Sequence, residues 1–353
     1  LSVHDLIRGD VELTENDQDI VILKGDGLPT YHFAHVVDDH FMKTTVVTRG
    51  EEWLSSLPIH IEMFKALKWK APDFAHLPVI MKLDNGNKRK LSKRKDPEAA
   101  VSYFLADGYP PAALIEYLMT IANSNFEEWR AANPLAPRHD FHFAFDKMSL
   151  DGALFDIMKL KFISREILSR ETAAKMTEDA RAYAVQYDRR LYDLIVSDSE
   201  YFESIMNIER EKENPRKDYE KFSDIFELVK FFYRDFYVQI LETELPFNPS
   251  FTHEVIAQVL RNIKETISLD LTEEEWFSGL KEIGERHHFA PSGKIFKANR
   301  EKYIGHIGDV AEMLRIAITG SKQSPNLYYV LKVLGLDEVQ ARLGIIIDKL
   351  SQS

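Results

Sequence analysis

The sequence predicts a multidomain protein in which an α/β domain is followed by mainly α-helical domains. At 353 residues, 44% of them hydrophobic, the chain is long enough to bury two or three cores. Short β-branched stretches alternate with helical patterns over about the first 100 residues, and from about residue 97 onward helical patterns follow one another. Strands that alternate with helices usually form a parallel sheet, whose ligands bind at the carboxyl ends of the strands.

The N-terminal α/β portion contains several short apolar stretches and one clear helix. A turn rich in Gly and Pro follows the first stretch, at residues 25–29. A helix is expected over residues 55–67, with Ile59, Met63 and Phe64 on its apolar face. The apolar and strand-like stretches are residues 19–24, 33–37, 44–48 and 76–81.

The remainder of the chain is expected to be helical. Two prolines open the first of these helices, where a missing amide costs little. Thr272 and Glu275 form a capping-box pattern ahead of a later helix, and the charged segment 209–221 is expected to be an exposed connection. The expected helices cover residues 110–119, 153–170, 172–187, 190–208, 218–243, 253–268 and 273–286, with a final block from 307 that is interrupted at 319–325.

The composition excludes several classes of protein. A net charge of −12 argues against a protein that coats nucleic acid non-specifically, although separate basic patches can still grip a folded RNA. The chain has no cysteine, which excludes disulfides, thiolate zinc sites and cysteine nucleophiles. It contains neither an apolar run long enough to span a membrane nor a signal-peptide pattern, so we expect a cytoplasmic protein without a membrane partner.

A dense run of cations stands out against the acidic background. Seven of the fourteen residues at positions 82–95 are Lys or Arg. A basic loop of this kind is suited to binding phosphate, but charge runs are more often only solvated. The order of residues favours phosphate binding, because Lys90-Leu91-Ser92-Lys93-Arg94 matches the KMSKS signature of class I aminoacyl-tRNA synthetases in its KLSKR form. In that family the loop closes over ATP, and its lysines stabilise the charge on the departing pyrophosphate.

Three further blocks resemble bacterial glutamyl-tRNA synthetases, in that family's order and at about its spacing. They are residues 27–40, residues 49–56, and residues 314–320 with 324–327. The resemblance therefore spans nearly the whole chain. It implies the second half of a class I Rossmann catalytic domain, a tRNA stem-contact region and a helical anticodon-binding region. The implied domains are residues 1–95, 96–170, 171–268 and 269–353.

The resemblance also implies an activity and its site residues. ATP, which brings its own Mg²⁺, would activate glutamate to an adenylate, and glutamate would pass to tRNA(Glu). By position, Tyr31, His35 and Arg49 would face glutamate, and Lys90 and Lys93 would act on the phosphates. The residues implied on the ATP side are Glu52, Trp53, Val79, Ile80, Ser92 and Lys93, and those implied at the anticodon are Arg315, Ser324, Pro325 and Leu327.

Each of these residues also has an ordinary structural interpretation. A guanidinium fork at Arg49 would select a carboxylate, but a surface arginine at a strand end is common. Tyr31 could pack rather than bind, and Val79 and Ile80 could be core residues. His35 departs from the family, because many relatives carry Asn there and a histidine titrates near neutrality. The cations expected near tRNA phosphates are Lys294, Lys297, Arg300 and Lys302, each of which is also a typical exposed residue.

We expect no metal site in the protein itself. The pair Asp38–Asp39 could bind magnesium or share a proton, but in the family such a pair belongs to the fold around the site. The histidines of 139–142 and 287–288 lack a third ligand at a recognisable spacing.

The HIGH signature of class I enzymes is missing from the positions where it belongs. The similar tetrad His306-Ile307-Gly308-Asp309 lies far downstream of the KLSKR loop, so we reject it. The opening residues 3–10 resemble the end of the family's acceptor-binding domain. The chain therefore looks like the C-terminal portion of a longer enzyme, and we expect the isolated chain not to aminoacylate.

Three alternatives remain beside this interpretation. A truncated synthetase paralogue would be a non-catalytic tRNA-binding module. The short enzyme that glutamylates a modified anticodon base should lack the helices after about residue 170. Bacterial glutaminyl enzymes carry a β-barrel anticodon region, against which the helical pattern argues. We expect a monomer, and the sequence does not decide whether tRNA(Gln) is also charged.

Overall fold

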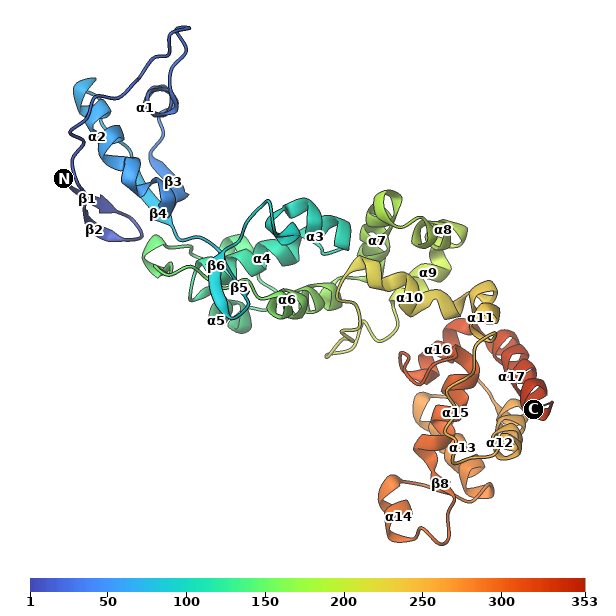
Figure 1. The fold of residues 1–353 in the computed structure, drawn as a ribbon. Helices are drawn as coiled ribbons and strands as arrows, with labels where there is room; N and C mark the ends of the chain where they lie inside the picture. The colour runs from blue at the N-terminus through green and yellow to red at the C-terminus, as the bar shows by residue number, and fades with distance from the viewer. Residues whose placement is uncertain (353) are drawn as a thin grey trace. The chain divides into compact units, whose positions relative to one another are not determined.

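The computed structural model describes residues 1–352 and divides into two compact units (Figure 1). The first unit is Leu1–Ser164, which contains all of the larger sheet. The second is Arg165–Ser353, which is built almost entirely of helices. The expected α/β portion followed by helical portions is confirmed.

A four-stranded sheet forms the base of the first unit. Its strand order is β2-β1-β4-β3, and only the β1–β2 pair is antiparallel. Strands β3 and β4 pair in parallel with Arg49 opposite His76, and β1 joins β4 in parallel at Asp5 and Phe74. The expected parallel sheet is therefore confirmed at its centre. The strands are β1 (Ser2–Asp5), β2 (Gly9–Glu12), β3 (Val46–Gly50) and β4 (Asp73–Leu77).

Two helices pack against each other beside this sheet, and one of them was not predicted. The 3-10 helix Glu51–Ser56 runs directly into α2 (Leu57–Ala66), which buries Leu57 and Phe64 as the apolar pattern of residues 55–67 predicts. The apolar stretch 33–37 lies inside α1 (Tyr31–Phe41). Thr30 opens α1 in an extended conformation, and Val36 is its buried residue.

The strand expected at residues 19–24 is wrong. This segment is an irregular loop in which Leu23 makes a single bridge to Pro29, and Val21 and Leu23 are exposed. Its β-branched composition favours a strand, but a strand also needs a neighbour to receive its hydrogen bonds. Here the backbone instead folds back on itself, since Lys24 and Thr30 donate to the carbonyls of Leu28 and Ile22.

The basic run forms a β-hairpin followed by a short loop. Strand β5 (Met81–Asp84) pairs with β6 (Asn87–Lys90) around the turn Asn85–Gly86. Both turn residues have positive φ, 49° and 82°, which Asn and Gly adopt at low cost in two-residue hairpin turns. The expectation of a loop throughout is thus wrong for residues 82–90, and the strand-like run 76–81 is divided between β4 and β5.

Helices fill the rest of the first unit. The Pro110–Pro111 start is confirmed, because Pro111 is the first residue of its helix. The buried hydroxyl of Tyr117 accepts a hydrogen bond of 2.7 Å from the Asp156 amide. The helices are α3 (Val101–Asp107), α4 (Pro111–Ala122), α5 (Phe126–Ala132) and the start of α6 (Ile157–Arg170), whose residues from Arg165 on belong to the second unit.

The second unit confirms most of the helices that periodicity predicts. The Thr272 and Glu275 capping box is present at the start of α13. The remaining two-residue strands, β7 (Phe289–Ala290) and β8 (Gly305–His306), pair in parallel. Its helices are α7 (Ala173–Tyr187), α8 (Arg189–Ser197), α9 (Ser199–Met206), α10 (Ile225–Val229), α11 (Arg234–Ile240), α12 (His253–Thr266), α13 (Glu273–Arg286), α14 (Gly293–Ala298), α15 (Ile307–Thr319), α16 (Leu327–Leu334) and α17 (Leu336–Ser351).

Two expected long helices are broken, one by a cap within the segment and the other by a side chain that is distant in the sequence. The helix expected over 190–208 divides at Asp198, whose carboxylate accepts the Tyr201 amide at 2.9 Å and caps α9. The one expected over 218–243 breaks around residues 230–232. There the carbonyl of Phe231 accepts from the fully buried Arg342 at 2.8 Å, which diverts it from a helical bond.

One hydrophobic core runs through the second unit. Helix α15 lies at its centre, with Leu314, Ala317 and Ile318 fully buried, and α12 packs against α17. Gly320 ends α15 in the left-handed conformation, where the expected interruption begins. Among residues 1–352, no helix combines the length and the apolar character that a membrane span requires.

Candidate functional site

Arg49 lies at the carboxyl end of β3 and is held by two histidines. Its Nε donates to His76 Nε2 on β4 at 2.9 Å, and its Nη1 is 3.0 Å from His60 Nδ1 on α2. Its Nη2 is buried and has no hydrogen-bond partner among residues 1–352. A buried donor without a partner costs free energy, so this group is prepared to receive an acceptor from outside the chain.

The surroundings of Arg49 are buried and carry little negative charge. Burial, followed by the charge of Arg49, lowers the pKa of His60 to about 3. Burial also lowers the pKa of His76, against the opposing effect of Asp5, whose Oδ2 lies 2.6 Å from His76 Nδ1. Both rings are therefore neutral at physiological pH. The pKa of Arg49 is itself lowered by burial, which the neighbouring Tyr31 opposes.

Tyr31 and His35, the other residues expected to face glutamate, lie beside Arg49 on α1. The His35 ring packs edge-on against His60 with centroids 4.6 Å apart, and the Tyr31 ring stacks on His35 at 5.8 Å. Tyr31 also contacts Trp53 at 4.8 Å, and half of its side chain is exposed. Burial lowers the pKa of His35 and outweighs Asp39, whose carboxylate is 2.8 Å away. His35 thus behaves as a neutral ring, and Asp39 has a local partner on its own helix.

The end of β3 also contacts the basic hairpin. Lys90 Nζ donates to Glu52 Oε1 at 2.7 Å, and this hydrogen bond lowers the pKa of Glu52. The preceding Glu51 pairs with Arg8 and lies 3.5 Å from the Val79 amide. The structure therefore brings Glu52 to Lys90 and places Val79 beside the same short helix. Val79 is half-buried rather than a core residue, and so is Ile80, whose carbonyl accepts the Leu91 amide.

A single carboxylate organises the KLSKR loop. Asp96 is buried and accepts both terminal nitrogens of Arg89, at 2.6 and 2.8 Å, and the Ser92 amide at 2.8 Å. Arg89, followed by the Ser92 amide, holds the pKa of Asp96 far below its usual range. Lys82 reaches the same carboxylate at 3.2 Å.

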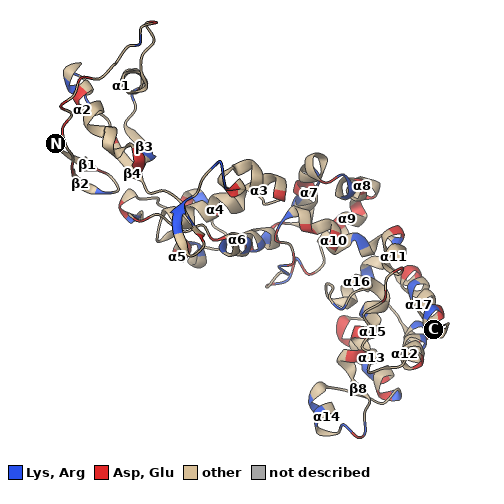
Figure 2. Ribbon diagram, viewed as in Figure 1, with Lys and Arg blue, Asp and Glu red and all other residues tan. Residues whose placement is uncertain are grey.

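The Lys and Arg residues of the basic run are blue in Figure 2, and their contacts divide them into two kinds. Lys82, Arg89 and Lys90 are paired with carboxylates, as described above. Lys93 lies exposed on the loop, and its side chain makes no hydrogen bond or ion pair within the described residues. Ser92 is held in the turn by its amide. The exposed end of the loop is the part of the run that remains available to an anion.

Two of the four residues expected at the anticodon, Arg315 and Leu327, line a cavity in the second unit. This cavity of about 650 Å³ is lined by Arg315 and by the aromatic pair Trp276 and Phe277. Arg315 Nε donates to Ser324 Oγ at 3.1 Å, and that hydroxyl donates to the Pro325 carbonyl at 2.8 Å. Leu327 also lines the cavity, although its side chain is almost completely buried, and the rest of the wall is Glu209, Glu273, Glu274 and Asn326.

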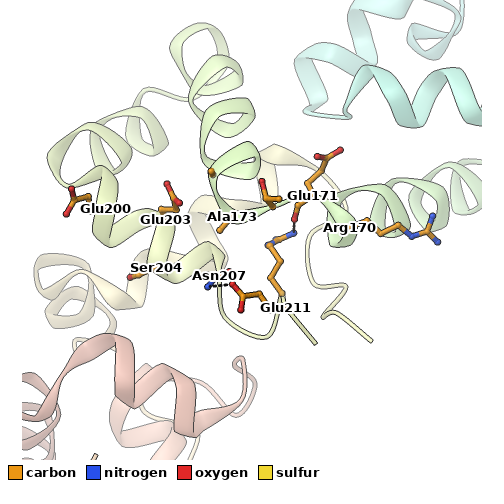
Figure 3. A pocket seen from close by; sticks show the side chains of 11 residues that line it. Arg170, Glu171, Ala173, Glu200, Glu203, Ser204, Asn207 and Glu211 are labelled. Atoms are coloured by element: carbon orange, nitrogen blue, oxygen red, sulfur yellow. Dashed lines mark hydrogen bonds between the residues drawn. The ribbon is translucent and has the colours of Figure 1, made fainter. Parts of the chain in front are cut away.

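A second cavity, of about 570 Å³, lies beside α7 and α9 (Figure 3). Glu171, Glu200, Glu203 and Glu211 line it, so it would repel phosphates. Arg210 in its wall donates to the carbonyls of three residues, Leu168, Glu171 and Met206, at 2.6 to 2.8 Å. Arg210 therefore has a structural role, because its hydrogen bonds connect the C-terminal ends of α6 and α9.

Comparison with known proteins finds two family models that match the chain. A family model described as "tRNA synthetases class I (E and Q), catalytic domain" matches residues 1–159, and an anticodon-binding domain model matches residues 175–347. The chain thus carries a class I tRNA synthetase catalytic domain match followed by an anticodon-binding domain match. The glutamate–tRNA ligase of Clostridium beijerinckii is 43% identical over 340 residues, and that of Sorangium cellulosum is 38% identical over 355.

The match covers almost all of this chain but not all of these relatives. It includes 96% of the chain and 62% of each of the two ligases. A crystal structure of a glutamate–tRNA ligase from Elizabethkingia meningosepticum, in complex with its amino acid, superposes with a TM-score of 0.71. That match covers 99% of this chain and 66% of the other at 22% identity, so it shows a shared fold.

The structure answers two questions that the sequence raised, about the tetrad at residues 306–309 and about the anticodon region. The His306–Asp309 tetrad, rejected above as a HIGH signature, is the capping box of α15: Asp309 Oδ2 accepts the His306 amide at 2.7 Å. The regular structure of the second unit is helical apart from two short strands, as the argument against a β-barrel anticodon region required. Within residues 1–352 no group of three His, Asp or Glu side chains is arranged to hold a metal ion.

The sequence analysis missed three residues that surround Arg49. Asp5, His60 and His76 come from β1, α2 and β4, so no local pattern connects them. His76 was visible only as the first residue of a strand-like run. No predicted strand pairing connected the two residues, because His76 opens its run whereas Arg49 follows the end of the stretch 44–48.

Proposed function

We propose that this chain takes part in glutamate–tRNA ligation, in which glutamate is activated by ATP and transferred to tRNA(Glu). The observation that carries the proposal is Arg49, a half-buried guanidinium whose Nη2 is buried and unpartnered and whose two described partners are neutral rings. Such a group binds a carboxylate strongly, because no protein carboxylate already pairs with it.

The side chains around Arg49 support selection of glutamate. Arg49 would bind the side-chain carboxylate, and the Tyr31 hydroxyl would donate to the substrate. A glutamine amide would place a donor against the guanidinium, which cannot accept a hydrogen bond. His35 would offer its buried Nε2, which has no partner among residues 1–352.

Glu52, Trp53, Val79, Ile80 and Ser92 would line the nucleotide side. ATP would arrive with Mg²⁺, and Lys90 and Lys93 would stabilise the negative charge that develops on pyrophosphate. Lys93 is already exposed, whereas Lys90 must leave Glu52 to reach a phosphate.

The second unit would recognise the anticodon of tRNA(Glu). Unstacked bases are commonly held between aromatic side chains and arginine. Arg315 with Trp276, Phe277 and Leu327 forms a cavity suited to one base, and Ser324 and Pro325 fix the arginine. Oligomeric state does not enter this proposal, although we expect a monomer.

The test is a charging assay with radiolabelled glutamate and tRNA(Glu). The chain is used alone and also joined to the portion of the Clostridium beijerinckii ligase that it does not cover; we call the joined protein the completed enzyme. We expect charging by the completed enzyme and none by the chain alone. Charging by the chain alone would contradict the expected inactivity.

A binding assay separates ligation from a non-catalytic role. We expect the chain to bind tRNA(Glu) more tightly than an unrelated tRNA. Specific tRNA binding, with no glutamate binding or charging by a folded completed enzyme, would favour the tRNA-binding module. Absence of both activities would overturn the proposal.

A further inference from the structure

The hydrogen bonds around Arg49 determine which nitrogen of each histidine carries the proton. An arginine side chain can only donate. His76 Nε2 must therefore accept from Arg49 Nε, so the proton of a neutral His76 is on Nδ1 and is donated to Asp5 at 2.6 Å. By the same argument His60 Nδ1 accepts from Arg49 Nη1, and the proton of His60 is on Nε2.

The hydrogen bonds that run from Asp5 through His76, Arg49 and His60 to His32 have a partner at each end. At one end Asp5 is almost completely buried, and its carboxylate accepts the amides of Ile7, Arg8 and His76 at 3.0 to 3.3 Å. Burial raises the pKa of Asp5, but the hydrogen bond from the His76 ring, followed by those from the three amides, outweighs it and keeps this pKa below its ordinary value. At the other end, His60 Nε2 lies 3.0 Å from His32 Nδ1 and donates to it.

We propose that His60 and His76, with Asp5 behind His76, are positioning residues for the substrate: as neutral acceptors they hold two sides of the Arg49 guanidinium and leave Nη2 for the substrate carboxylate. This inference rests on the proposed function. A carboxylate in place of either ring would neutralise Arg49 and compete with the substrate. A ring nitrogen instead fixes the guanidinium without cancelling its charge.

The groups that face these histidines support the neutral state. His60 meets Arg49 from β3 and His76 from β4, both of which disfavour a second proton. From α1 it meets His32, His35 and the ring of Tyr31. The carboxylates of α1, Asp38 and Asp39, act on His35. Among residues 1–352, Asp5 is the carboxylate that hydrogen-bonds directly to one of these two rings, and it accepts the proton of His76.

The first test is NMR of the ligand-free 353-residue chain with ¹⁵N-labelled histidine. Signals are assigned by their loss in H60Q and H76Q. At pH 7.5, above the ordinary histidine pKa, we expect His76 as the Nδ1–H tautomer and His60 as the Nε2–H tautomer, both neutral. A doubly protonated ring at either position, or the opposite tautomer, would overturn the inference.

The second test measures glutamate recognition by the completed enzyme. We expect H60L to raise the KM for glutamate about tenfold with little change in kcat, because Arg49 loses one fixed contact. H60Q, whose amide oxygen can accept the same hydrogen bond, should recover most of the affinity. Equal losses in H60L and H60Q, or a loss confined to kcat, would contradict a positioning role.

A third variant acts at a distance from Arg49. In D5N, the amide nitrogen can donate to His76 Nδ1, which moves the His76 proton to Nε2. The Nε2–H of His76 and the Nε–H of Arg49 would then face each other as two donors, and their hydrogen bond would be lost. We expect both the reversed tautomer and a weaker affinity for glutamate. The reversed tautomer with unchanged affinity would contradict the inference. If D5N does not fold, as judged by its melting curve, the two His60 variants decide.

The control is H4Q, which removes an exposed histidine that pairs with Asp10 in the same unit. It should leave the KM and both tautomers unchanged. If the wild-type completed enzyme folds but neither binds nor uses glutamate, the proposed function fails, while the tautomers still decide whether the two rings hold Arg49.

Discussion

Arg49 and Arg89 lie in the same unit, and each is fixed by at least two hydrogen bonds, yet their partners differ in charge. Arg89 is held by Asp96 and Asp84, which neutralise it. Arg49 is held by His60 and His76, which do not. Arg89, whose charge is neutralised, organises a loop, whereas the charge of Arg49 remains free to attract a carboxylate from outside the chain. Residue type and exposure alone would not distinguish them.

The largest effect is expected from removing the available arginine. In the completed enzyme, we expect R49Q to weaken glutamate affinity more than about 100-fold, because about 3 kcal/mol is typical when one partner of a buried charged pair is removed. The KM for glutamate in the charging assay measures it. The matched control is R138Q, which removes an exposed arginine of the same unit. Equal KM values for wild type and R49Q would remove Arg49 from the site.

An arginine of the second unit extends the comparison to tRNA. We expect R315A to weaken tRNA(Glu) binding about 10- to 100-fold, since one contact to a base typically contributes about 1–3 kcal/mol. The matched control is R234A, which removes an exposed arginine that is paired with Glu338. Fluorescence anisotropy with labelled tRNA gives both affinities. A loss in R234A as large as that in R315A would mean that only total charge matters.

How much the sequence predicts depends on how local each interaction is. Helix α13 was predicted with its cap because Thr272 and Glu275 are three residues apart and bond to each other's backbone. The strand at 19–24 failed because a strand depends on a partner elsewhere. The prediction of an unbroken helix over 218–243 failed for the same reason, because the helix breaks near Phe231, whose partner Arg342 is 111 residues away.

The candidate site shows the same limit. The Gly27–His40 and Arg49–Ser56 blocks and the KLSKR signature were read directly from the sequence, and they identified Tyr31, Arg49 and Lys90 as candidates. Their partners were not visible, because Glu52 meets Lys90 across 38 residues and His76 meets Asp5 across 71. Those contacts decide which cations remain available, and only the folded chain brings them together.

The paired arginine gives a prediction about stability and pH. The folded-state pKa of Asp96 lies below its ordinary value of 3.8, so its stabilising contribution is complete above about pH 4 and is lost as the pH falls further. We therefore expect D96N to melt at a lower temperature than wild type at pH 7. The difference should shrink between pH 4 and pH 2.

Thermal unfolding of the chain followed by circular dichroism checks this at each pH. The control is D151N, which replaces an exposed carboxylate of the same unit. A melting difference between wild type and D96N that is constant from pH 7 to pH 2 would show that the charge of Asp96 is not what stabilises the loop.

The smallest effect is expected at the exposed ion pair between Glu52 and Lys90. Both side chains are about half exposed, at 47% and 56%, so solvent screens their attraction. We expect E52Q to lower the free energy of unfolding by at most about 1 kcal/mol, and the difference should vanish at about 1 M salt. Urea denaturation of E52Q, K90Q and the double variant isolates the coupling. A coupling above about 2 kcal/mol that survives salt would mean that Lys90 is held as firmly as Arg89, and the loop could not then release it to a phosphate at low cost.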